Sequence, residues 1–456
     1  MRIVHISAHT QLPSGRMAAD LCRMARKAGH QELFCYGSGP APTDILTLQV
    51  GDHPDLSQPM RHLRVHAANA GIRLHKALSR VTDRCGFYSA TATEWLLQQL
   101  EAFSPDVIHL HDLHGFYLHL PTLFDYLQDT DIPVVWTLHD LWPVTGHCVN
   151  NHLPIDPYQA SQPDSFAAGQ CLLWQSQCGG CPLRKSYPAS LLDQSGRNHA
   201  QKKDLFTCLT YLTLTTPSQW LHDRVARSFL RDYPIHTLPM GIDPGQFAPC
   251  ADEAHMQDTA LFYGLDRLNG RRMVLSLCSP WEDQQELAHL TALAQQLGED
   301  YCVVAAGLSK HQIETLPSHM IGLPRPANPG DLCVLYTAAD CCVCLRPGEA
   351  CGTSLLEAMA CGTQVLGYHT AALPEIITPQ VGQLVPTGDI AAAADGVRSL
   401  CHDPKDPLRC IAQAARYSAS KRYQPYLELY EQAVLEKQER LNRTRRRLVR
   451  QSANCP

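Results

Sequence analysis

The sequence lacks any long hydrophobic run. No window of its 456 residues holds the roughly 18 uninterrupted apolar residues that a membrane-spanning helix needs. We also expect no N-terminal leader, because Met1 and Arg2 lead directly into the short buried-strand pattern Ile3–Ile6. We therefore expect a protein that is made and kept in the cytoplasm.

The sequence also has little excess charge of either sign. The formal net charge is −6, and charged residues make up 18% of the chain. A general nucleic-acid binder would carry a basic excess, so we expect no nucleic-acid partner. Hydrophobic residues make up 45%, which predicts a large packed core and excludes global disorder. The length favours two or three domains over one.

Cysteine, in contrast, is abundant, with 20 residues. A secreted disulfide scaffold would be shorter and would carry a leader, so most of these cysteines are expected to be small buried hydrophobes. One group differs because it lies in segment 146–188, which is rich in Cys, Pro, Gln and Ser and has no clear periodicity. The group consists of Cys148, Cys171, Cys178 and Cys181. We predict that this segment is an irregular insertion.

Short β-branched runs alternate with helical patterns along most of the chain. Val107–Leu110 and Pro133–Leu138 predict strands in the first half. In the second half, the helical pattern Gln284–Leu297 lies between the strand patterns Met273–Cys278 and Cys302–Ala306. This alternation predicts an α/β fold with doubly wound parallel sheets.

Turn-forming residues at His236–Pro249 divide this pattern and predict an interdomain hinge. We expect a Rossmann-like domain at 1–240 and a second one at 241–420. Residues 421–456 should form a C-terminal helix that packs back on the first domain and ends in a basic tail. Two such domains create a cleft between the carboxyl ends of their sheets, which is where open α/β sheets bind ligands.

The most informative stretch holds two carboxylates, Glu349 and Glu357, eight positions apart. Glu349 follows the turn Pro347-Gly348, and Glu357 lies within the apolar run Leu355–Met359. The first acid should therefore lie at a strand-to-helix turn and the second one turn into the helix. The free N–H groups between them belong to Gly352, Thr353 and Ser354. Such a helix start is a phosphate cradle, and the alternative is an N-capped helix with two solvated acids.

Further motifs accompany this stretch. They are Trp136–Cys148, Thr216–Leu221, Gly241–Asp243 with Phe247, and Glu357–Thr363. Over nearly the whole chain, this set resembles the retaining nucleotide-sugar glycosyltransferases of family 4, in the branch that assembles colanic acid and other exopolysaccharides. The resemblance implies a GT-B fold, in which two Rossmann-like domains face each other across a cleft. It also implies sugar transfer from a nucleotide diphosphate sugar to a lipid-linked or polysaccharide hydroxyl, with the configuration retained and no metal or other cofactor required for the chemistry.

The resemblance assigns roles to individual residues. Glu357 would accept hydrogen bonds from the ribose hydroxyls, and Glu349 from sugar hydroxyls near the reacting carbon. The N–H groups at the helix start would hold the donor diphosphate; they belong to Gly352, Thr353, Ser354 and Leu355. His139, which follows the strand Val134–Leu138, would face the donor sugar, with Asp140 orienting its ring. A core histidine bonded to the backbone is the alternative for His139.

The first strand is followed by Ser14, Gly15 and Arg16. Gly15 should lie in the loop and let the backbone approach the donor diphosphate. Arg16 is either a neighbour of that diphosphate or an ordinary surface arginine. His109, His111 and His114 suggest a metal site, but His109 and His111 share one face of a strand. We expect these three to be polar lining of the acceptor cleft.

The chain departs from the family pattern where a basic pair followed by glycine is expected. Gln284 and Gln285 stand in place of the basic residues, and Glu286 in place of the glycine. Arg346, or the pair Arg271-Arg272, could supply the missing counter-charge to the donor phosphates. Met240 stands where the family prefers Asn. This departure supports a rival reading, a non-catalytic saccharide- or nucleotide-binding protein or synthase subunit; a phosphorylase or epimerase of the same fold is a further rival.

Two features remain outside the transfer chemistry. Cys178-Gly-Gly-Cys181 together with Cys148 and Cys171 predicts a structural zinc that orders the insertion, with His147 as a substitute ligand. Free thiols or a disulfide are the alternatives. The C-terminal basic run is formed by Arg440, Arg443, Arg445, Arg446, Arg447 and Arg450. It predicts contact with anionic phospholipid at the inner face of the membrane, and the alternative is a frayed, solvated terminus.

Overall fold

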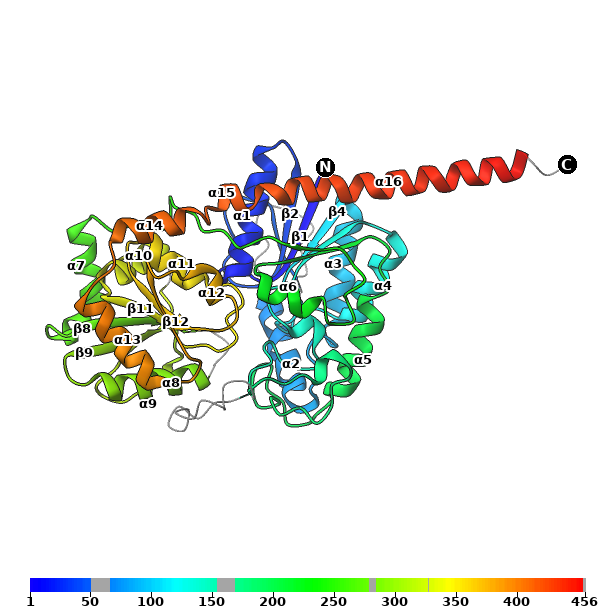
Figure 1. Cartoon of the computed structure of the whole chain (residues 1–456). Helices are drawn as coiled ribbons and strands as arrows, with labels where there is room; N and C mark the ends of the chain where they lie inside the picture. The colour runs from blue at the N-terminus through cyan, green and yellow to red at the C-terminus, as the bar shows by residue number, and fades with distance from the viewer. Residues whose placement is uncertain (51–65, 154–168, 279–283, 327, 454–456) are drawn as a thin grey trace.

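The computed structural model describes residues 1–50, 66–153, 169–278, 284–326 and 328–453. Two sheets with helices around them form two halves that lie side by side (Figure 1). The strand order is β3-β2-β1-β4-β5-β6-β7 in the first sheet and β10-β9-β8-β11-β12-β13 in the second. Every strand pairing is parallel. The predicted pair of doubly wound sheets is therefore confirmed.

The strands of the first sheet are β1 (Arg2–His9), β2 (Gln31–Ser38), β3 (Thr47–Gln49), β4 (Val107–Leu110), β5 (Val134–Thr137), β6 (Leu212–Thr216) and β7 (Ile235–Thr237). Those of the second are β8 (Arg272–Leu277), β9 (Tyr301–Ala306), β10 (Ile321–Leu323), β11 (Cys341–Cys344), β12 (Val365–Tyr368) and β13 (Gly382–Val385). The central strands are buried along their length, as expected for parallel strands that are covered on both faces.

The helices of the first half are α1 (Pro13–Lys27), α2 (His66–Thr82), α3 (Ala90–Phe103), α4 (Leu120–Thr130), α5 (Ser195–Phe206) and α6 (Gln219–Val225). Those of the second are α7 (Glu253–Phe262), α8 (Gln284–Leu297), α9 (Lys310–Thr315), α10 (Pro329–Ala338), α11 (Thr353–Ala360), α12 (Leu373–Ile376), α13 (Ile390–His402) and α14 (Pro407–Ala415). Two helices end the chain, α15 (Ala419–Arg422) and α16 (Gln424–Ala453). No helix in the described ranges is both long and apolar enough to cross a bilayer.

Helix α1 begins earlier than the sequence pattern predicts. The helical spacing of apolar residues over Met17–Lys27 predicts a start at Met17, whereas the helix starts at Pro13, because proline at the first helical position is already set to a helical φ. Gly15 therefore lies in the first turn of α1 and not in the loop. A β-carbon on Gly15 would lie 1.8 Å from the carbonyl oxygen of His9, so glycine lets the helix start close to the end of β1.

Helix α16 leaves the second half and lies on the first (Figure 1). Tyr426 and Tyr430 of α16, together with Tyr423 just before it, are buried in one cluster with Ile3 and Val107 of the first sheet. The expected single helix is interrupted at Tyr423, so α15 and α16 are separate. Beyond the first half, α16 continues as an isolated projection (Figure 1).

The two segments that connect the halves run next to each other. Ile242 donates its N–H to the carbonyl of Tyr417 at 2.8 Å, and Ala419 donates to the carbonyl of Ile242 at 2.8 Å. A β-carbon on Gly241 would lie 2.4 Å from the Cα of Ala419, so glycine permits this close approach. The predicted hinge segment thus has a second connecting segment beside it, which is the part of the chain that returns toward α16.

Candidate functional site

Glu357 lies on α11 at the boundary between the two halves. It is 1% exposed, and its Oε2 accepts a hydrogen bond from the hydroxyl of Tyr336 at 3.0 Å. Its Oε1 forms an ion pair with the guanidinium of Arg16 on α1. Arg16 is therefore not an ordinary surface arginine, because it joins the first half to the predicted ribose-binding carboxylate.

A narrow crevice opens beside this ion pair. Both halves contribute to its walls, with Arg16 and Asp20 from α1, Asp243 and Phe247 from the connecting segment, and Thr353 and Glu357 from α11. The guanidinium of Arg16 lies 5.6 Å from the centre of the Phe247 ring. Glu357 therefore lines the gap between the halves, although its present partner closes most of the access to it.

The start of α11 offers fewer free N–H groups than expected. Gly352 donates its N–H to Glu349 Oε1 at 2.8 Å, and Leu355 donates its N–H to the carbonyl of Gly352 at 3.1 Å. The backbone N–H groups of Thr353 and Ser354 have no hydrogen-bond partner within the described residues. The prediction of a free N–H is thus wrong for Gly352. The N–H of Leu355, which was expected to hold the diphosphate, is also engaged, so two donors remain for an anion.

Glu349 turns toward its own helix. Besides Gly352, its Oε1 accepts the N–H of Cys351 at 3.2 Å, and its Oε2 lies 2.7 Å from Nη2 of Arg346. The side chain is 11% exposed. Glu349 thus caps the helix start electrostatically, and a sugar hydroxyl would have to displace one of these contacts.

Arg346 is held between two carboxylates. Its Nε lies 3.4 Å from Oε1 of the buried Glu286, and its Nη2 contacts Glu349. Burial lowers the pKa of Arg346, but Glu286 and Glu349 outweigh burial and raise it well above its ordinary value. Glu286 therefore has a defined partner where the resemblance expects glycine, and the charge of Arg346 is already matched.

The other predicted substitutes lie at the wrong edge. Arg272 is the first residue of β8, so it lies at the amino end of the sheet, whereas α11 follows the carboxyl end of β11. Arg271 donates its guanidinium to the carbonyls of Arg267 and Leu268. The pair Arg271-Arg272 is thus not a counter-charge for a ligand at α11. The side chain of Gln284 and all of Ser279–Asp283 lie outside the described residues.

Arg325 is a basic residue whose charge interacts with Arg16 and Glu357, and the sequence analysis does not name it. It follows β10, is half-buried, and has no ion pair or hydrogen bond with any residue in the described ranges. Burial lowers its pKa, and the nearby charge of Arg16 lowers it further, while Glu357 opposes this. A basic residue directly after the carboxyl end of a strand was the available sequence signal.

His139 follows β5 at the carboxyl edge of the first sheet. Its Nε2 lies 3.2 Å from Nδ1 of His111, so its ring partner is another imidazole and not the backbone. Asp140 does not orient this ring. Its carboxylate instead bonds Nε2 of His114 at 2.8 Å and accepts the N–H of Trp142 at 2.8 Å.

His114 lies between two carboxylates, Asp112 and Asp140, and is 2% exposed. Burial lowers the pKa of His114, but the two carboxylates outweigh burial and raise it above its ordinary value. Ser14 donates its hydroxyl to Asp112, which ties this group to the start of α1. His114 therefore belongs to a charged group at the edge of the first sheet.

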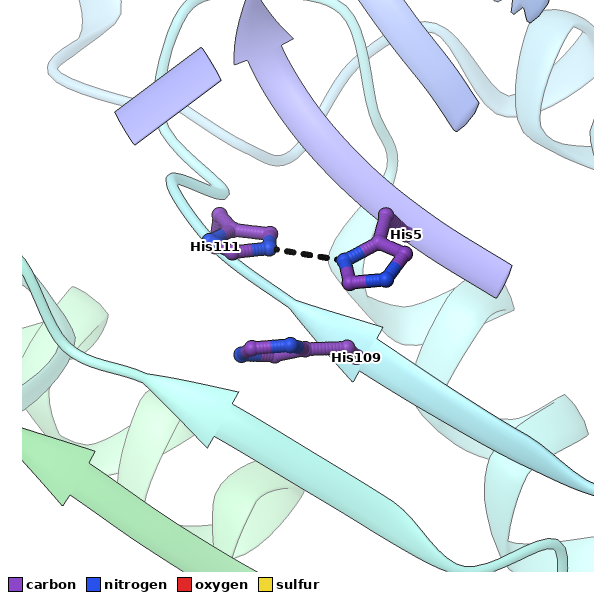
Figure 2. Close-up of side chains that lie close together, drawn as sticks. All are labelled: His5, His109 and His111. Atoms are coloured by element: carbon purple, nitrogen blue, oxygen red, sulfur yellow. Dashed lines mark hydrogen bonds between the residues drawn. The ribbon is translucent and has the colours of Figure 1, made fainter. Parts of the chain in front are cut away.

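The predicted role of His109 as cleft lining is wrong. It is fully buried, with Nδ1 2.6 Å from the hydroxyl of Tyr430 and Nε2 2.7 Å from the hydroxyl of Thr137. It lies beside His5 and His111 (Figure 2). The docking of α16 covers His109, and no local sequence pattern predicts that contact.

One ring nitrogen from each of His5, His109 and His111 lies within 4.8 Å of the others. The rings of His109 and His111 are stacked, with centroids 4.1 Å apart and planes at 30°. Imidazole lone pairs lie in the ring plane, so stacked rings do not direct them at one point. Both nitrogens of His109 and of His111 also have hydrogen-bond partners, and we therefore do not assign a metal to this group.

Among the four cysteines of the insertion, Cys148 is buried and the other three are partly exposed. Burial raises the pKa of the Cys148 thiol, and the charges of Cys181, Cys178 and Cys171 raise it further. None of them belongs to a described group of three ligand atoms within 4.8 Å of one another. His147 contacts Asp83 and the carbonyl of Ser186, so the expectation that it substitutes as a ligand is wrong. The four thiols could bind one metal ion only if their side chains turned toward a common point.

Comparison with known proteins identifies the family. A model of Glycosyltransferase Family 4 matches residues 14–246, and a model of glycosyl transferases group 1 matches residues 279–417. The protein named as the colanic acid biosynthesis glycosyl transferase WcaC of Escherichia coli K12 is 27% identical over 250 residues, covering 53% of this chain. The chain spans 55% of that relative's length. The D-inositol 3-phosphate glycosyltransferase of Corynebacterium jeikeium K411 is 28% identical, covering 79% of this chain and 83% of its own.

Solved structures share the fold. Sucrose-phosphate synthase from Thermosynechococcus elongatus has a TM-score of 0.63 at 15% identity, covering 95% of this chain and 99% of its own. Anabaena Alr3699/HepE in complex with UDP-glucose has a TM-score of 0.57 at 15% identity, covering 95% and 100%. The predicted GT-B arrangement is confirmed by these neighbours and by the two sheets. Because the first family model matches more than half of the chain, this protein belongs to Glycosyltransferase Family 4.

Proposed function

We propose that this protein is a retaining glycosyltransferase that moves a sugar from a nucleotide diphosphate sugar to a hydroxyl of a lipid-linked or polysaccharide acceptor in exopolysaccharide assembly. One observation carries the proposal. The buried Glu357 lines the crevice between the halves on the same helix as the unpaired N–H groups of Thr353 and Ser354. The names of WcaC and of the UDP-glucose complex of HepE support the substrate class.

The donor would bind with its diphosphate against the start of α11. The N–H groups of Thr353 and Ser354 point with the positive end of the helix dipole, which stabilises the charge that the leaving diphosphate develops. The ribose hydroxyls would donate hydrogen bonds to the carboxylate of Glu357, so Arg16 would have to leave that carboxylate when the donor binds. Front-side attack, in which a leaving phosphate oxygen takes the acceptor proton, needs neither a protein base nor a metal.

The test is binding followed by turnover. We expect one of the UDP-, GDP- and ADP-sugars to raise the melting temperature of the full chain, and that donor to support transfer or slow hydrolysis. Replacing Glu349→Ala should lower the rate, because each charge-assisted hydrogen bond contributes about 1.5–3 kcal/mol. An equal, low rate in both proteins would contradict the proposal.

That outcome would favour the second candidate, a non-catalytic saccharide- or nucleotide-binding protein or synthase subunit. A specific observation favours it: Gln284 and Gln285 replace a basic pair, while Arg346 and Arg16 are already matched by carboxylates. A thermal shift with a nucleotide sugar but no turnover would identify this candidate.

We also propose that zinc orders the Cys-rich insertion through Cys148, Cys171, Cys178 and Cys181. Metal analysis of the protein purified under reducing conditions should give about one zinc per chain, as four thiolates bind one ion. Cys178→Ser should lose the metal, whereas Cys208→Ser, outside the insertion, should keep it. Zinc far below one equivalent in the unsubstituted protein would end the idea.

The projecting end of α16 is proposed to contact anionic lipid. Its basic residues begin at Arg440, and the side chains of residues 444–453 lie outside the described residues. The full chain should sediment with vesicles containing phosphatidylserine, more weakly at high salt and not with neutral vesicles. A chain that lacks residues 440–456 should remain in the supernatant. Equal sedimentation of the two chains would show that the tail makes no such contact.

A further inference from the structure

A row of hydrogen-bonded histidine rings, formed by His5, His111 and His139 and called the file below, leads from the core of the first half to its carboxyl edge. Nδ1 of His5 lies 3.2 Å from Nε2 of His111 (Figure 2), and Nδ1 of His111 lies 3.2 Å from Nε2 of His139. The rings of His111 and His139 are stacked, with centroids 5.5 Å apart. These three residues come from β1, the loop after β4 and the loop after β5, which are neighbours in the sheet.

Both ends of this file are buried atoms without a partner. Nε2 of His5 and Nδ1 of His139 have no hydrogen bond with any residue that the structure describes. His5 is fully buried and His111 is 1% exposed, whereas His139 is only half-buried. A buried polar atom without a partner is uncommon, so each end requires an explanation.

Burial favours the neutral form of each ring. Burial lowers the pKa of His5 to about 3 and lowers the pKa of His111 well below its ordinary value. Burial also lowers the pKa of His139, although Asp112 and Asp140 oppose this. A neutral imidazole carries one N–H and one acceptor nitrogen. Three rings therefore hold three protons, of which two lie in the hydrogen bonds between them.

The third proton must lie at one end, on His5 or on His139. On His5 it would be an orphaned N–H in the core, which proteins avoid more strongly than an unpaired acceptor. On His139 it would lie at the carboxyl edge of the sheet, near the carboxylates of Asp112 and Asp140, whose charge favours a proton on that ring. The second placement leaves only an unpaired acceptor inside the core.

We propose that His5 and His111 are positioning residues that fix His139 as the Nδ1–H tautomer and aim that N–H at an oxygen of the bound donor sugar. His5 Nδ1–H donates to His111 Nε2, and His111 Nδ1–H donates to His139 Nε2. The tautomer is a property of the free protein. The identity of the oxygen as a sugar oxygen rests on the proposed function.

His109 lies beside the file but is not part of it, since its nitrogens bond Tyr430 and Thr137. A better matched control is His75 on α2, which is also 1% exposed and hydrogen-bonded; it bonds Ser89 and the N–H of Gly86, and none of its hydrogen bonds involves a residue of the file. Replacing His75→Gln removes a buried imidazole without touching the file.

The experiment reads tautomers directly in the full chain. With ¹⁵N-labelled histidine, two-bond ¹H–¹⁵N correlations distinguish Nδ1–H from Nε2–H rings, and the His139 signal is assigned by its loss in His139→Gln. We expect His139 as Nδ1–H in the unsubstituted protein and in His75→Gln. In His111→Phe the Nδ1–H form of His139 should no longer be fixed, so its population should fall. His111→Asn, whose side chain can donate and accept, should restore part of that population. An Nε2–H ring at His139 in the unsubstituted protein would overturn the proposal, even if the variants at His111 do not fold.

Turnover gives the second readout. His111→Phe should lower kcat about tenfold with little change in KM for the donor, since the loss of one aligned hydrogen bond is expected in the transition state. An unchanged His139 tautomer in His111→Phe, or one zinc bound by the file and lost in His5→Ala, would also overturn the proposal. If the tautomers are as expected but no nucleotide sugar binds, the proposed function fails while the hydrogen-bonded file stands.

Discussion

Replacing Glu357→Ala should lower kcat/KM for the donor by a factor of about 100 or more. In the proposed binding mode, two hydrogen bonds from ribose hydroxyls to this carboxylate would be lost, each contributing about 1.5–3 kcal/mol. The same change removes the partner of Arg16 and of the Tyr336 hydroxyl. Arg16 remains 24% exposed, so water can solvate part of its charge, and we expect a loss of stability of only about 1–3 kcal/mol.

Steady-state kinetics and urea unfolding together separate the two effects. Glu357→Gln should keep the bond with Tyr336 and most of the stability, but not the activity. Glu375→Ala is the matched control, because Glu375 also joins the halves by accepting the N–H groups of Gln219 and Trp220, yet it does not line the crevice. Activity of Glu357→Ala within tenfold of the unsubstituted protein would remove Glu357 from the donor site.

Replacing Gly15→Ala should lower the free energy of unfolding by about 3 kcal/mol, an overpacking effect at the upper end of the usual range. The new β-carbon would lie 1.8 Å from the carbonyl oxygen of His9 and 2.9 Å from the carbonyl carbon of Thr10. The first turn of α1 must therefore move away from β1. Arg16 is the next residue, so the same shift should also weaken its contact with Glu357 and change donor affinity.

Urea unfolding checks the size of this effect. The control is Gly71→Ala in the exposed part of α2, where an added β-carbon meets nothing within 4 Å. That change should be neutral or stabilise the protein by about 0.5–1 kcal/mol, since alanine is the better helix former. Equal stability of the two variants would show that Gly15 is not held against the strand.

The sheets were predictable because their signals are local. The apolar run at β4 and the helical period at α8 gave boundaries that agree with the structure at Val107–Leu110 and Gln284–Leu297. The strand-to-helix turn before α11 also follows from Pro347-Gly348 and the apolar run behind it. The missed strands β3, β7, β10 and β13 are only three or four residues long, which leaves almost no periodicity to detect.

The contacts of the site were less predictable because they depend on distant parts of the chain. Arg16 meets Glu357 across 341 positions, and His109 meets Tyr430 across 321. Spacing placed Glu349 correctly at its turn but could not show that its carboxylate caps its own helix. Likewise, the sequence suggests Arg346 as the replacement cation but does not show that Glu286 lies beside it and matches its charge.

The paired connection between the halves has a mechanical consequence. A single extended segment can twist about its own axis, whereas two segments cross-linked by hydrogen bonds behave as a ribbon that bends easily in one plane and resists torsion. Ile242 is fastened to both Tyr417 and Ala419 in this way. Separation of the two halves should therefore be a hinge bending in one plane about the paired connecting segments, without free rotation of one half relative to the other.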